Sequence, residues 1–161
     1  YNMKKLIFCC LVVFMGACKD KDKDVDPDQD YAQEFVGDYQ TMTINNNVVG
    51  TEHVWGITRV NNNQLKIAYT KNITVTIPGG EVKSWQKLEL ANVVTTESNK
   101  FTINEIVDMQ SQDGAITKQK LEGQGTKVVN AAGVPQINID LTLTNTATGV
   151  PMTEYLEFKK R

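Results

Sequence analysis

The chain has 161 residues, with 17 basic and 19 acidic side chains and a formal net charge of −2. A length near about 150 residues is typical of one domain, and the near balance of charge excludes the basic surface that nucleic-acid binding requires. Because the sequence holds only three cysteines and one histidine, most metal and nucleophile chemistry is also excluded, and we expect no metal and no cofactor.

The first predicted element is a secretory signal. Lys4 and Lys5 precede the apolar run 6–15, which leads into Gly16-Ala17-Cys18. Basic residues, a short apolar run and small residues before a cut are the three parts of such a signal. Residues 15–18 resemble a bacterial lipobox, in which the chain is cut before a cysteine that receives lipid. We predict a signal peptide over 1–17 and lipid attachment at Cys18; an ordinary secretory signal is the alternative.

A charged tether is predicted to follow the signal. Residues 19–30 read KDKDKDVDPDQD, with three lysines and six aspartates. A segment without an apolar face cannot bury surface and should stay disordered. We therefore assign 18–34 to the lipidated cysteine and a disordered tether, and 35–161 to the folded domain. The opening Lys19-Asp20-Lys21-Asp22 resembles a surface-export signal of Bacteroidota lipoproteins.

The folded part shows a period of two, interrupted by turn residues, which predicts antiparallel strands. Asn triplets at 45–47 and 61–63 and the Pro78-Gly79-Gly80 sequence mark turns, and 78–83 reads as a loop. We predict eight strands, over 37–45, 48–60, 65–75, 85–94, 100–108, 115–129, 136–145 and 152–159. No window shows a helical stripe of apolar residues.

The alternation also predicts which side chains face the core. Ile137, Ile139, Leu141 and Leu143 share one face, and Leu156 and Phe158 continue it after the next turn. One apolar and one polar face per strand, with short links between strands, favours an all-β, eight-stranded antiparallel up-and-down barrel. A β-sandwich predicts nearly the same pattern and is the alternative.

The sequence Gly37-Asp38-Tyr39 at the start of the first strand is similar to the G-x-W/Y motif that opens lipocalin-type barrels. Together with the lipobox, the acidic tether and the terminal strand 155–159, it makes the chain resemble the calycin-like lipoproteins of Bacteroidota. The resemblance implies an eight-stranded barrel anchored by lipid to the outer membrane, with exposure at the cell surface as a further expectation. That family's biochemical role is largely undefined.

Few residues point to specific chemistry. His53 shares a face with Trp55 and could act as a base or hold a ligand, but a core histidine is the more ordinary interpretation. Trp55, Trp85, Tyr69 and His53 are our candidate ligand-binding residues, since aromatic side chains at a barrel mouth suit an apolar ligand or a sugar ring. Trp85, after the 78–83 loop, is the one we most expect to be exposed.

Two functional hypotheses follow. The first is a non-enzymatic, membrane-anchored envelope lipoprotein that binds a small apolar or sugar-like ligand or another envelope protein. The second is a surface hydrolase that uses His53 or a pair of carboxylates. Its candidate acids are scattered singly over the predicted strands: Glu52, Glu89, Glu105, Glu122 and Asp140. We favour the first, because we identify no catalytic residues and no nucleophile–base pair.

Overall fold

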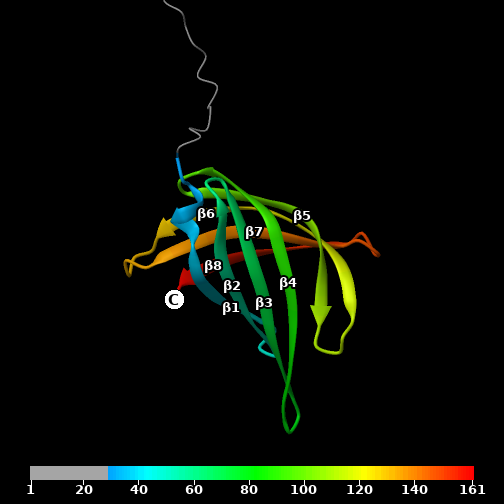
Figure 1. The fold of residues 1–161 in the computed structure, drawn as a ribbon. Helices are drawn as coiled ribbons and strands as arrows, with labels where there is room; N and C mark the ends of the chain where they lie inside the picture. The colour runs from blue at the N-terminus through cyan, green and yellow to red at the C-terminus, as the bar shows by residue number, and fades with distance from the viewer. Residues whose placement is uncertain (1–28) are drawn as a thin grey trace, which may run out of the picture.

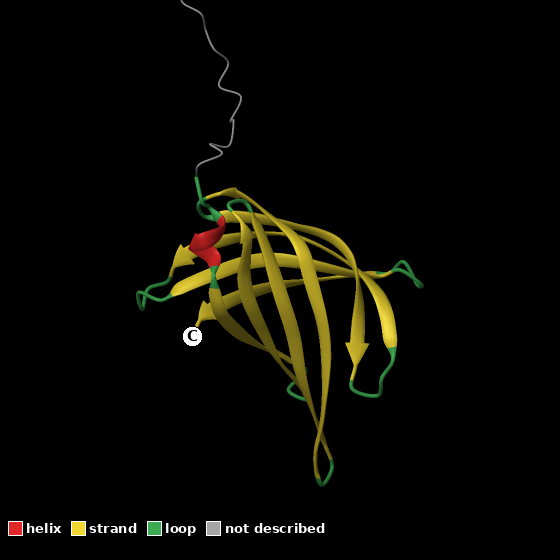
Figure 2. Cartoon of the chain, in the orientation of Figure 1, coloured by secondary structure: helices red, strands yellow, loops and turns green. Residues whose placement is uncertain are grey.

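The computed structural model describes residues 29–161. The predicted signal peptide, Cys18 and the tether up to residue 28 lie outside them. The described chain contains one short 3₁₀ helix and eight strands (Figures 1 and 2). These are η1 (Ala32–Phe35), β1 (Gly37–Asn45), β2 (Val49–Asn61), β3 (Gln64–Ile77), β4 (Gly80–Glu97), β5 (Lys100–Ser111), β6 (Ile116–Val129), β7 (Pro135–Asn145) and β8 (Pro151–Lys160).

The strands form a closed antiparallel barrel in which each strand pairs with its neighbours in sequence. Closure comes from β1 and β8, which pair over only two positions, Tyr39 with Lys160 and Gln40 with Lys159. The backbone amide of Arg161 extends this contact by donating to the carbonyl of Asp38 at 2.9 Å. The up-and-down barrel is thus confirmed, and the β-sandwich alternative is wrong, because a sandwich leaves the first and last strands unpaired.

The apolar faces lie where the alternation places them. Leu141 is fully buried whereas Asp140, one residue earlier, is exposed. Ile137 pairs with Phe158 and Ile139 with Leu156, and all four are buried. The register of the last two strands is therefore the one predicted, because a shift by one residue would turn every side chain to the opposite face.

Strand β4 differs most from its predicted range, since it extends over Gly80–Glu97. The predicted loop at 78–83 is wrong, because only Pro78 and Gly79 form the turn and Ile77 already pairs with Gly80. Gly79 has a φ of 90°, a conformation that glycine adopts without steric cost. The β3–β4 hairpin consequently extends far beyond its neighbours, at the lower end of Figure 1.

The opposite end of the barrel is closed by η1. Ala32 and Phe35 are fully buried, and Phe35 packs edge-on against Phe101 with ring centroids 5.2 Å apart. Asp30 receives a hydrogen bond from the backbone amide of Gln33. The predicted tether ends at residue 34, which is too far along the chain, because residues 32–34 belong to η1 and so to the folded domain.

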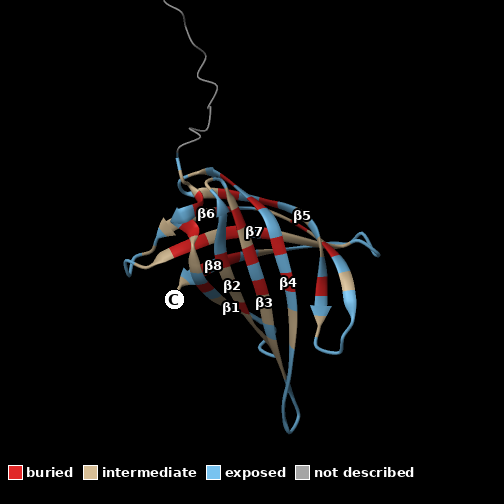
Figure 3. Cartoon of the chain, in the orientation of Figure 1, coloured by how far each residue is buried: buried red, intermediate tan, exposed pale blue. Residues whose placement is uncertain are grey.

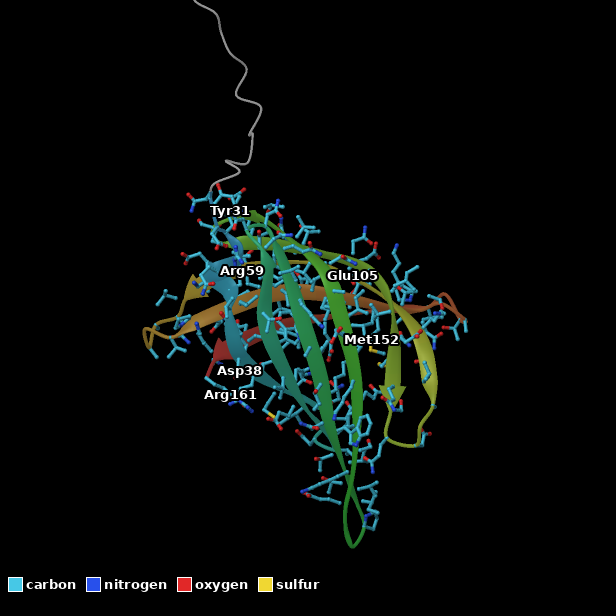
Figure 4. All side chains as sticks on the ribbon, in the orientation of Figure 1. Tyr31, Asp38, Arg59, Glu105, Met152 and Arg161 are labelled. Atoms are coloured by element: carbon cyan, nitrogen blue, oxygen red, sulfur yellow. The ribbon has the colours of Figure 1, made fainter. Side chains whose placement is uncertain are left out.

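Polar contacts hold η1 and the residue Asp30 before it against the barrel. Asp30 pairs with Arg59 at 2.8 Å, and Lys127 donates to the backbone carbonyl of Glu34 at 2.6 Å. Tyr31 and Arg59 both lie at this end in Figure 4. No helix among residues 29–161 is long and apolar enough to cross a membrane.

Candidate functional site

The register of β1 to β4 arranges the inward-facing side chains in successive layers along the barrel. Residues that pair directly across neighbouring strands and point to the same face form one layer. The aromatic layer consists of Tyr39, Trp55, Tyr69 and Leu88. The polar layer, next toward the β3–β4 hairpin, consists of Thr41, His53, Lys71 and Gln86. The outer layer consists of Thr43, Thr51, Ile73 and Ser84.

Burial falls steadily from one layer to the next. Every member of the aromatic layer is buried. In the polar layer only His53 is buried and the other three are intermediate, while in the outer layer Ser84 is exposed and the rest are intermediate. Figure 3 shows the same change along β3 and β4, from buried segments near β7 to an exposed hairpin. Because these side chains all point inward, solvent enters the barrel from this side, which we call the open end.

The floor of the open end is made of packed aromatic rings. Trp55 stacks on Phe158 with centroids 3.8 Å apart and an interplanar angle of 17°, and Tyr69 meets Trp55 edge-on at 5.8 Å. Two polar atoms in this floor, Tyr39 Oη and Trp55 Nε1, are buried and have no hydrogen-bond partner among residues 29–161. A buried donor without a partner costs about 1–3 kcal/mol, so the packing of this floor comes at some cost in polar contacts.

His53 joins the floor to the layers above it. Its Nδ1 lies 2.7 Å from Tyr69 Oη and its Nε2 lies 2.9 Å from Thr43 Oγ1. The Tyr69 hydroxyl has no other hydrogen-bond partner in the described chain, so it donates its proton only if Nδ1 accepts it. In the tautomer that allows Tyr69 to donate, the imidazole proton lies on Nε2 and is donated to Thr43 Oγ1.

Burial changes the acid–base behaviour of these groups. Loss of hydration, reinforced by the positive charge of Lys71, lowers the pKa of His53 from 6.5 to about 4. Burial also raises the pKa of Tyr39 to about 12. Burial and the negative charge of Glu154 both raise the pKa of Tyr69. At neutral pH the floor therefore carries no charge of its own.

Two charged side chains of the open end were not among the predicted site residues. Lys71 lies in the polar layer beside His53, and its Nζ is 5.5 Å from the centre of the Tyr69 ring. Glu154 extends from β8 into the same space, since it alternates with the buried Leu156 and Phe158. The sequence could have revealed both charges, because each lies two residues from a core-facing residue of the same strand. Lys71 follows Tyr69, and Glu154 precedes Leu156.

The predicted site residues separate into two groups. Trp55, Tyr69 and His53 come together in the barrel, but Trp85 does not join them. Trp85 pairs with Asn72 on β3. It lies three residues before the buried Leu88 on β4, and an odd spacing along a strand turns two side chains to opposite faces, so Trp85 lies on the outer surface. There it is half-buried beside the β5–β6 turn. The ammonium of Lys87 lies 4.6 Å from the ring centre of Trp85.

Four of the five candidate carboxylates of the hydrolase hypothesis each have a different partner, and the fifth, Asp140, is exposed on β7. Glu52 binds Arg161, Glu89 binds Lys66 and Glu122 binds Lys120. Glu105 accepts hydrogen bonds from the backbone amides of Ala91 and Asn92 at 3.1 and 2.7 Å, and so bridges a break in the β4–β5 ladder. Within residues 29–161, no group of His, Cys, Asp and Glu side chains has a metal-binding arrangement.

Comparison with known proteins supports the fold. No protein-family model matches the chain, and no curated protein matches it in sequence. Among solved structures it is similar to a β-barrel, EF1p2_mFAP2b bound to DFHBI, with a TM-score of 0.50 and 12% sequence identity. The alignment covers 82% of this chain and 98% of that one. At this identity the similarity shows a shared barrel architecture, which fits a calycin-like fold.

Proposed function

We propose that this protein is a non-enzymatic binding protein that takes a small, partly apolar ligand into the open end of its barrel. The decrease in burial from the aromatic layer to the outer layer carries this proposal. At this end the inward-facing side chains become accessible to solvent above a buried aromatic floor, so that a ligand can reach them. Concave apolar surfaces with a few convergent polar groups are typical of small-molecule sites.

One further observation supports a ligand at this place. The structurally similar EF1p2_mFAP2b was solved with DFHBI bound, and a small molecule in the present barrel would be in keeping with that precedent.

We propose in addition that lipid on Cys18 anchors the protein to the outer membrane, on the surface-exposed side. The lipobox-like residues 15–18 are the basis for this part of the proposal. The described chain begins beside η1, at the closed end of the barrel. An anchor attached upstream of that point would leave the open end facing away from the lipid, accessible to a ligand.

Binding can be tested with the uncharged dye Nile red, whose fluorescence increases in an apolar environment. We expect saturable binding to the wild-type protein. Ile73→Trp should abolish it, because this inward, half-buried position would fill the open end. Thr74→Trp, one residue later and on the opposite face, is the matched control and should bind as the wild type does. Equal binding by both variants, or none by the wild type, would refute the proposed site.

A further inference from the structure

From Lys71 and Glu154 we infer that the ligand carries a zwitterionic head group, as in an amphipathic α-amino acid. This inference rests on the proposed function, because it concerns the chemistry of the same open end. It assigns the ligand's anion to Lys71, the ligand's cation to Glu154, and the ligand's apolar chain to the surrounding wall.

The ammonium of Lys71 is short of partners. It makes no hydrogen bond or ion pair within residues 29–161, and the Tyr69 ring is its one close favourable contact. Loss of hydration lowers the pKa of Lys71, although the negative charge of Glu154 acts in the opposite direction. The Glu154 carboxylate therefore interacts electrostatically with the Lys71 ammonium, but this interaction does not compensate for the hydration that the ammonium has lost. A half-buried cation in this situation favours an anionic partner.

The carboxylate of Glu154 on β8 also lacks a partner. It too makes no hydrogen bond or ion pair in the described chain, while its charge acts on both Lys71 and Tyr69. Phe158, on the same strand and face, lies 6.3 Å from the rings of both His53 and Tyr69. The inward faces of β8 and of β2–β3 thus lie across the barrel from each other, with one unpaired charge on each.

Opposite charges on two walls distinguish between classes of ligand. A simple anion would satisfy Lys71 but repel Glu154, and a simple cation would do the reverse. A zwitterion satisfies both and leaves the site neutral. An uncharged head group satisfies neither, so charge complementarity provides selectivity among ligands with the same apolar chain.

The surroundings of these charges are apolar toward the closed end, and toward the rim apolar residues lie beside the hydroxyl side chains of the outer layer. Toward the closed end lie Trp55 and Phe158, which are buried. Toward the rim the same faces continue with half-buried Ile73, Val75 and Val49. A head group held between Lys71 and Glu154 can therefore extend an alkyl chain along this rim.

The test compares four ten-carbon probes by isothermal titration calorimetry at pH 7: 2-aminodecanoic acid, decanoate, decylamine and decan-1-ol. The zwitterion should bind about tenfold more tightly than the others, since one charge-assisted contact contributes about a factor of ten or more. Lys71→Met should remove this advantage and shift the preference toward decylamine. Glu154→Gln should shift it toward decanoate.

Matched control variants are available on the outer faces of the same two strands. Lys66→Met on β3 and Glu157→Gln on β8 should leave the order of the four probes unchanged. Binding of all four probes with equal affinity, or an order insensitive to Lys71→Met and Glu154→Gln, would overturn the zwitterion inference and leave the binding function standing. Failure of every probe and of Nile red would instead overturn the proposed function itself.

Discussion

Protonation of His53 should destabilise the barrel by an amount that follows from its burial. Its pKa is about 4 in the folded protein and 6.5 when unperturbed. Between these values the unfolded chain binds a proton that the folded chain does not, so the free energy of unfolding decreases as the pH falls. At about 1.36 kcal/mol per pKa unit, the full loss is about 3 kcal/mol below pH 4, of which about 2 kcal/mol appears between pH 7.5 and 5.

The assay is urea unfolding of the wild type and of His53→Gln at pH 7.5, 6 and 5. Glutamine keeps an acceptor for Tyr69 and a donor for Thr43 but does not titrate. Lys71 and Glu154, the charged groups that face His53 across this end, are present in both proteins, so their own titration cancels in the difference. The stability advantage of the wild type over the variant should shrink by about 2 kcal/mol over this range.

A direct measurement accompanies the unfolding data. Because the sequence contains one histidine, its imidazole Hε1 signal in a proton NMR spectrum needs no assignment. We expect the chemical shift to stay constant from pH 7.5 to 5 and to move only near pH 4. A midpoint near 6.5, or the same pH dependence of stability in the wild type and His53→Gln, would refute the argument from burial.

Three other predictions concern packing and anchorage. Leu141→Ala should cost about 2–5 kcal/mol because it leaves a cavity in the core, whereas the exposed Asp140→Asn should stay within about 0.5 kcal/mol; urea melts showing the reverse order would contradict the register. Gly125→Ala should cost about 1–3 kcal/mol, since a Cβ there would lie 2.3 Å from Phe101 Cζ; the combination with Phe101→Leu should recover part of the loss in thermal melts. Mass spectrometry of the native protein should find an acylated N-terminal Cys18, and an unmodified N-terminus would contradict the anchor.

The sequence alone determined the strands and the faces of most of them. In β7, alternating apolar residues from Ile137 to Leu143 fix the inward positions, because the pleat of a strand turns successive side chains to opposite sides. The same rule placed His53 and Trp55 on one inward face. These are local properties, and the pattern of apolar residues reports them without knowledge of the partner strand.

The sequence failed where local signals were ambiguous. The Pro78-Gly79-Gly80 turn signal favours a loop over 78–83, yet pairing with β3 keeps residues 80–83 extended. The predicted tether included Ala32, whose burial depends on the closure of one end of the barrel by η1. Trp85 is a candidate site residue only because it is aromatic. Its odd spacing from the inward-facing Leu88 on the same strand places it on the outer surface.

Only the tertiary structure decided that the sheet closes on itself. A barrel and a sandwich bury the same alternating residues, and what separates them is the pairing of Tyr39 with Lys160 between the first and last strands. That pairing depends on the summed twist and stagger of all eight strands, which no single segment encodes. Closure is also what sets Glu154 opposite Lys71 and stacks Phe158 on Trp55, so the chemistry of the open end results from contacts between residues far apart in the chain.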